Sequence, residues 1–259
     1  DSVSIAFWGR FLSAPGSKNR AKRGIPCRFF AEHLRSTIPS SVLSPTSAMH
    51  DPFIAHLRQQ LLQPLPGRDA QYRMASLRRL QELGAVPAPP ADARVACVLH
   101  LLHRQEQEWR TVLIERTHNP NDRHSGQISF PGGRYEPADG SLEEVALREA
   151  EEEIGISRDQ VEMLGRLTEL YIPVSNYVVH PFVGLLHGPA RFSAQPGEVA
   201  QVLTPALSAF YEFKRKDISL HSGMILPDVP FFDVQGRAVW GATAMILSEF
   251  LELVDRGAA

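Results

Sequence analysis

The sequence predicts an α+β fold with a mixed β-sheet, in which strands outnumber helices. Beyond residue 90, short apolar runs typical of strands recur, whereas helical periodicity is confined to a few segments. Runs of strands interrupted by isolated helices are typical of α+β domains. Of the 259 residues, 43% are hydrophobic, which is enough for a substantial core and too many for a disordered chain.

The first 48 residues differ in composition from the rest. They contain seven Lys or Arg against two acids, about +5, so a net charge of −2 leaves about −7 for the remainder. We expect residues 1–48 to be a basic, disordered extension, which a start assigned upstream of Met49 would also explain. An organellar targeting segment and a nucleic-acid or membrane arm stay open as alternatives, and a cytoplasmic location is favoured.

Residues 49–90 are predicted to be a helical segment followed by a linker. Apolar side chains fall at helical spacing from Phe53 to Leu62, Pro52 suits the first turn, and Pro64 ends the run. A second helix is predicted over 70–83. The proline-rich stretch 86–90 fits neither a helix nor a central strand.

Residues 91–256 are predicted to form the main domain. A polar turn is expected at 105–108, a polar loop at 117–126, and helices at 141–154 and 240–254. His100 and His103 have no metal-ligand spacing, so we interpret them as structural. The predicted strands are 94–102, 111–114, 128–130, 161–170, 177–186, 200–203 and 218–220.

The helix at 141–154 is the most informative segment. Ser141 followed by Glu144 is a capping box that marks its start. Glu149, Glu152 and Glu153 stand at i, i+3 and i+4, so like charges are neighbours and repel unless a cation neutralises them. Mg²⁺ and Mn²⁺ prefer such oxygen ligands, although a solvated acidic face is the ordinary alternative.

These residues resemble a known motif. Gly132-Gly133 followed by residues 148–156 (REAEEEIGI) resembles the Nudix box, whose core is R-E-U-x-E-E-x-G-U with U apolar. The glutamate that the box usually carries eight residues before the arginine is Gly140 here, preceded by Asp139. With an aspartate at this place after the sequence FPGG (residues 130–133), the chain resembles the Nudix branch that hydrolyses coenzyme A.

Other stretches resemble the same branch, and the resemblance covers roughly residues 65–254. Residues 113–133 resemble its upstream motif, with Glu115 replacing a threonine and a different arginine spacing. Residues 175–181 (SNYVVHP) and 240–243 (WGAT) are also similar. The resemblance implies a Nudix-type α/β/α sandwich over 91–256.

The resemblance implies metal-dependent hydrolysis of the pyrophosphate bond of coenzyme A or acyl-CoA, with Mg²⁺ or Mn²⁺ as cofactor. Another nucleoside diphosphate derivative (ADP-ribose, NADH or a dinucleotide) is the first alternative, and a non-catalytic nucleotide-binding domain the second. A small-molecule nucleotide partner is expected, with no nucleic acid and no membrane, and a homodimer stays open.

The implied site divides into four groups of residues. Glu149, Glu152 and Glu153 would bind metal, while Glu152 and Arg148 would be catalytic. Substrate binding is assigned to Arg116, Arg123, His124, Gly132 and Gly133. Asp139 and Glu198 are additional candidates.

Overall fold

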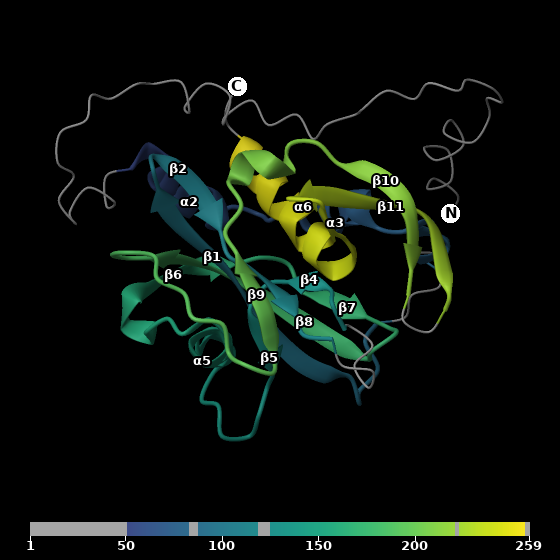
Figure 1. Ribbon diagram of the computed structural model, residues 1–259, viewed down its shortest axis with the longest axis horizontal. Coiled ribbons are helices and arrows are strands. Elements are labelled where there is room, and N and C mark those ends of the chain that lie inside the picture. The colour runs from purple at the N-terminus through teal and green to yellow at the C-terminus, as the bar shows by residue number, and fades with distance from the viewer. Residues whose placement is uncertain (1–50, 83–87, 119–124, 221–222, 257–259) are drawn as a thin grey trace, which may run out of the picture.

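The computed structural model describes residues 51–256, apart from 83–87, 119–124 and 221–222 (Figure 1). The predictions for residues 1–48 therefore lie outside the described residues. No helix within the described ranges has the length and apolar character needed to cross a bilayer.

The largest sheet is mixed. Its order is β2-β1-β8-β6, with β5 paired to β1 and β7 paired to β8. Strands β1 (Arg94–Gln105) and β8 (Tyr177–Leu186) run parallel, and every other pairing in this sheet is antiparallel. The remaining members are β2 (Glu108–Thr111), β5 (Gly132–Arg134), β6 (Val161–Arg166) and β7 (Leu170–Ile172).

Two three-stranded antiparallel sheets complete the β-structure. One has the order β4-β3-β9, formed by Ile128–Ser129, Leu113–Arg116 and Val199–Leu203. The other has the order β10-β11-β12, formed by Lys214–Ser219, Ile225–Val234 and Arg237–Val239. The short segment between β4 and β5 connects the sheet β4-β3-β9 to the largest sheet.

The largest sheet lies between two helical layers, with α5 (Leu142–Ile154) on one side and α6 (Gly241–Asp255) on the other (Figure 1). Strand β1 supports both layers because successive side chains alternate between its faces. Leu99 and Leu101 belong to the core beneath α5, whereas Leu102 belongs to the core beneath α6. The α+β class and the predicted sandwich of helices around a mixed sheet are thus confirmed.

The N-terminal helices pack onto the layer that contains α6. Helix α2 (Pro52–Leu61) begins at the N-cap Asp51 and buries Phe53, Ile54 and Leu57. Two one-turn helices follow, α3 (Gly67–Gln71) and η2 (Tyr72–Met74), and then α4 (Leu77–Glu82). Buried Glu249 on α6 holds this layer together, because it accepts hydrogen bonds from Gly67 N, Gln71 Nε2 and Thr168 N at 2.8–3.2 Å.

Several predicted elements differ from the structure. The predicted helix over 70–83 is broken into α3, η2 and α4, because Ala75 is extended. The predicted strand 111–114 is divided at Val112, where the chain leaves β2 for β3 in another sheet. The predicted strand 161–170 is divided between β6 and β7. The sequence missed β11 and β12 and most of β10, since charged residues and prolines there obscure the strand alternation.

His100 on β1 is fully buried between Phe130 and Phe250, with ring centroids 4.8 and 4.2 Å away. Within the described part of the chain, neither of its ring nitrogens has a hydrogen-bond partner. Burial lowers the pKa of His100 from 6.5 to about 3, because the charged imidazolium would be desolvated. The structural interpretation of this histidine agrees with its place in the core.

We expect His100 to make folding stability fall in acid. Between pH 6.5 and 3 the unfolded chain binds a proton at His100 that the folded chain does not, so unfolding is favoured as pH drops. From pH 7 to 5 this amounts to about 2 kcal/mol. Urea unfolding at both pH values should show a smaller loss of stability for His100→Leu than for the unmodified chain. Equal losses would contradict the burial of a neutral His100.

Candidate active site

Helix α5 has well-defined ends. The Ser141 hydroxyl accepts a hydrogen bond from Glu144 N at 3.2 Å, and the Glu144 carboxylate accepts one from Ser141 N at 3.1 Å. This capping box satisfies two backbone donors that the helix leaves unpaired. At the other end, Gly155 adopts a left-handed conformation with φ 69°. The apolar face packs on β1 and consists of Val145, Ala146, Ala150 and Ile154.

Two glycines bring the backbone of β5 against the carboxylates of α5. Gly132 N donates a hydrogen bond to Glu153 Oε2 at 2.8 Å. A Cβ at Gly132 would lie 2.3 Å from Cys97 O, and one at Gly133 would lie 2.3 Å from the Glu149 carboxyl group. A larger residue at Gly132 would therefore push β5 away from β1, and one at Gly133 would displace the Glu149 carboxylate.

Arg148 is the centre of an ion-pair network. Its guanidinium donates to both Asp139 carboxylate oxygens, at 2.8 and 3.2 Å. It also contacts Glu149 Oε1 at 2.9 Å and Glu152 Oε2 at 3.3 Å. The hydrogen bonds from Arg148 hold the pKa of Asp139 below its usual value. Arg148 therefore joins the loop before α5 to two of the predicted metal ligands.

Glu153 is almost completely buried, with 2% of its surface exposed. Its pKa is raised from 4.5 to about 7, chiefly by desolvation and also by the nearby carboxylates Glu149 and Glu198. The Gly132 N–H and the Arg116 guanidinium, whose Nη1 lies 3.9 Å from Glu153 Oε1, act in the opposite direction. These two groups therefore only partly offset the cost of burying the charged Glu153 carboxylate.

The site is completed from β3 and β9. Arg116 ends β3 and is paired in register with Val199, which follows Glu198 directly. The next residue, Thr117, donates its N–H to Glu198 O at 2.9 Å. The Glu198 carboxylate is close enough to raise the pKa of both Glu149 and Glu153. The two additional candidates from the sequence therefore both lie near the helix glutamates. Asp139 is joined to them through Arg148, and Glu198 acts on Glu149 and Glu153.

Of the three basic residues assigned to substrate binding, the structure describes one and leaves two undescribed. Arg116 was predicted to bind substrate phosphate, and its side chain faces Glu153 at the centre of the acidic cluster. Arg123 and His124 lie outside the described residues.

The chemistry of the donors fits a hard divalent cation. Within the described ranges, no group of three or more His, Cys, Asp or Glu side chains is arranged as a ligand sphere, and Arg148 lies among the carboxylates instead. However, desolvation raises the pKa of both Glu149 and Glu153. A cation bound by oxygen ligands would relieve this cost, so the donor set suits a hard divalent cation.

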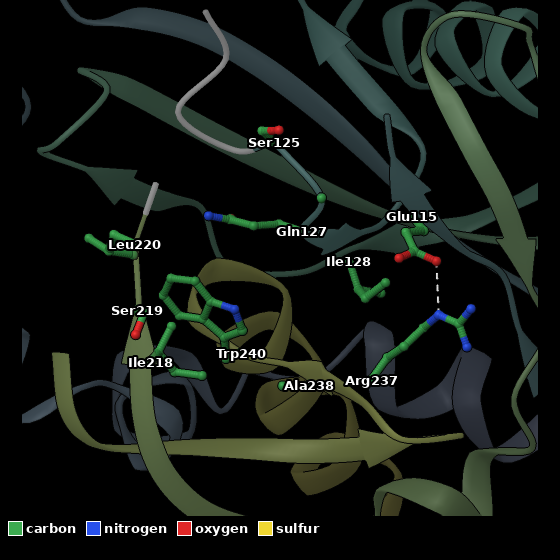
Figure 2. Close-up of a pocket in the computed structure, with 11 residues that line it drawn as sticks. Glu115, Ser125, Gln127, Ile128, Ile218, Ser219, Leu220, Arg237, Ala238 and Trp240 are labelled. Atoms are coloured by element: carbon green, nitrogen blue, oxygen red, sulfur yellow. Dashed lines mark hydrogen bonds and ion pairs between the residues drawn. The ribbon is translucent and has the colours of Figure 1, made fainter. Parts of the chain in front are cut away.

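A cavity of about 260 Å³ lies beside β3 (Figure 2). One wall is formed by Glu115 on β3 and by Gln127 and Ile128 at the start of β4. The other includes Arg237 on β12 and Trp240, which precedes α6. The sequence pointed to residues 240–243 as functional only through the family resemblance, and it did not predict a role for Arg237. No local pattern relates Glu115 to Arg237, because 122 positions separate them.

Comparison with known proteins gives one family. The NUDIX domain profile matches residues 92–220. A Photorhabdus laumondii protein described as an uncharacterised Nudix hydrolase NudL is 35% identical over 148 residues, covering 56% of this chain and 78% of the relative. Its Yersinia enterocolitica counterpart is 34% identical over 146 residues, covering 56% and 74%. A solved MutT/nudix family protein from Enterococcus faecalis aligns with a TM-score of 0.42 and 20% identity, over 72% of this chain and 73% of that one.

We predict that Asp139→Asn weakens binding of Mn²⁺ by about tenfold or more, because residues that orient metal ligands typically contribute that much. Loss of the carboxylate releases Arg148, which then no longer holds Glu149 and Glu152 in place. Isothermal titration with Mn²⁺ measures the effect. Glu136→Gln is the matched control, since it removes the same charge nearby from a side chain that pairs with Arg134 instead. Equal weakening by both variants would contradict a specific role for Asp139.

Proposed function

The chain belongs to the Nudix hydrolase family, and from that premise we propose that it hydrolyses the pyrophosphate bond of coenzyme A or acyl-CoA. The products are 3′,5′-ADP and 4′-phosphopantetheine or its acylated form. The observation that carries the proposal is the set of carboxylates on α5, held against the glycine backbone of β5 and joined by Arg148 to Asp139.

Each residue of the cluster has a distinct part in this proposal. Glu149, Glu152 and Glu153 would hold the divalent cation, which when bound stabilises phosphoryl oxygens as a Lewis acid and makes water easier to deprotonate. Arg148 orients Glu149 and Glu152 through its ion pairs. Arg116 compensates the buried charge of Glu153 from the opposite side.

Glu152 is the proposed general base. Its side chain is 55% exposed, whereas that of Glu149 is 14% exposed and that of Glu153 is 3% exposed. Glu153 accepts a hydrogen bond from Gly132 N at 2.8 Å, and Arg148 contacts Glu149 at 2.9 Å but Glu152 only at 3.3 Å. Glu152 is therefore the acid that a water molecule can approach most freely, and a general base must be within hydrogen-bonding reach of its water.

The choice of coenzyme A rests on the motifs around the site. The FPGG segment, residues 130–133, leads into β5, and Asp139, next to the position where the box usually carries a glutamate, accepts a hydrogen bond from Arg148. Thr243 in the WGAT segment donates its hydroxyl to Ile128 O at 3.0 Å, which fastens the start of α6 to the strand before FPGG. The Thr243–Ile128 contact therefore supports the proposal that the FPGG and WGAT segments contribute to the same substrate-binding region.

A substrate panel tests the proposal. With Mg²⁺ or Mn²⁺ present, we expect coenzyme A to be hydrolysed with a higher kcat/KM than NADH or ADP-ribose. Chromatographic detection of 3′,5′-ADP and 4′-phosphopantetheine identifies the bond that is broken. Turnover of coenzyme A no faster than that of ADP-ribose would overturn the choice of substrate while leaving the reaction class in place.

We expect Glu152→Gln to lower kcat by about 100-fold or more, the contribution typical of a general base, with the fold retained because the side chain is exposed. Glu151→Gln is the control. Its carboxylate lies on the same helix, pairs with Arg158 outside the cluster, and is 42% exposed. Steady-state kinetics for both variants should separate them, and near-normal turnover in Glu152→Gln would refute the assignment of the base.

A further inference from the structure

We propose that the cavity beside β3 is the subsite for the adenine base, which stacks on the indole of Trp240. The inference rests on the proposed function, because it assigns one end of an adenine-containing nucleoside diphosphate substrate to a place in the fold. The cavity measures about 260 Å³. Pockets that enclose a whole drug-sized ligand measure roughly 300–1,000 Å³, so this one suits a single ring system.

The walls of the cavity suit a flat aromatic ring. Figure 2 shows the Trp240 indole with the Gln127 side chain above it and Ile128 beside it. An indole face provides a broad stacking surface with few rotatable bonds. Ile218 lines the cavity from β10 and is itself buried, so it supports this wall. Trp240 directly precedes α6, and the Thr243–Ile128 hydrogen bond fixes the start of that helix against β4.

The polar groups suit a neutral base better than a phosphate. Arg237 Nε donates to Glu115 Oε2 at 2.8 Å, and its Nη2 donates to Gln201 Oε1 at 2.8 Å. The positive charge on this wall is therefore balanced inside the protein. Gln127 also lines the cavity, and a glutamine amide has the side-by-side donor and acceptor that match the N6 and N7 positions of adenine.

The cavity and the carboxylate cluster are adjacent in the fold. Glu115 lines the cavity, while the next residue, Arg116, faces Glu153, because consecutive strand side chains leave on opposite faces. Arg116 N also donates to the carbonyl of Gln127 at 3.1 Å. Strand β3 ends at Arg116, so the cavity and the carboxylate cluster both lie against the last two residues of this strand.

A second hollow, of about 550 Å³, suits a base less well. It is lined by Arg94, Arg134, Tyr135 and Tyr177 together with Val95, Glu136 and Pro137. The Arg94 guanidinium already covers the Tyr177 ring at 4.1 Å from its centroid, and 42% of Tyr135 is exposed. This hollow therefore provides the matched control for the experiment.

Binding of the two product halves to the full chain tests the subsite without relying on turnover. By isothermal titration, we expect Trp240→Leu to weaken 3′,5′-ADP about tenfold or more, in line with the loss of a base-stacking partner. Binding of 4′-phosphopantetheine should be unchanged. Trp240→Phe should restore most of the affinity for 3′,5′-ADP, and Gln127→Ala should weaken it without altering the thermal unfolding transition.

The outcomes separate this inference from the proposed function. Loss of 4′-phosphopantetheine binding in Trp240→Leu, or loss of 3′,5′-ADP binding in Tyr135→Leu but not in Trp240→Leu, would overturn it. So would unchanged 3′,5′-ADP binding in both Trp240→Leu and Gln127→Ala. If the unmodified chain hydrolyses ADP-ribose in preference to coenzyme A, the proposed substrate fails, yet the binding contrast at Trp240 still decides the adenine subsite.

Discussion

The close approach of β5 to α5 is the constraint on which the site depends. Gly132 N reaches Glu153 Oε2 at 2.8 Å, and the backbone at Gly133 lies where a side chain would collide with Glu149. A side chain at Gly132 would collide with β1, and one at Gly133 would displace the Glu149 carboxylate from its place against the strand. The same approach removes water from Glu149 and Glu153, which raises the pKa of both. The geometry that assembles the site thus also makes it require positive charge.

The distribution of charge follows from this requirement. The overall charge of −2 hides a basic N-terminal segment and an acidic remainder. Part of that acidity is gathered around α5, where Arg148 and Arg116 pair with its carboxylates. They only partly compensate the cluster, since burial still leaves the pKa of Glu153 near 7. A bound cation would invert the local sign and admit an anionic substrate to an acidic domain.

Local patterns in the sequence were sufficient for α5 and for most of the central sheet. Ser141, Glu144 and Gly155 mark the ends of the helix through short-range chemistry that survives into the fold. Long-range contacts were not predictable in this way. The pairing of Arg116 with Glu153 depends on where the fold places the end of β3 relative to α5, and Lys214–Ser219 forms a strand because β11 supplies its hydrogen-bonding partner. The metal-binding and substrate-binding roles stay predictions.

The segment from Gln127 to Gly133 links recognition to chemistry. Its first residues line the cavity and its last residues support the carboxylates. Thr243 donates a hydrogen bond to the carbonyl of Ile128 and so anchors the beginning of the segment. Because this anchor lies at the start of α6, a shift of that helix would displace both regions together. The packing of α6 against the N-terminal helices, held by buried Glu249, therefore bears on the site although none of those helices contributes a residue to the acidic cluster.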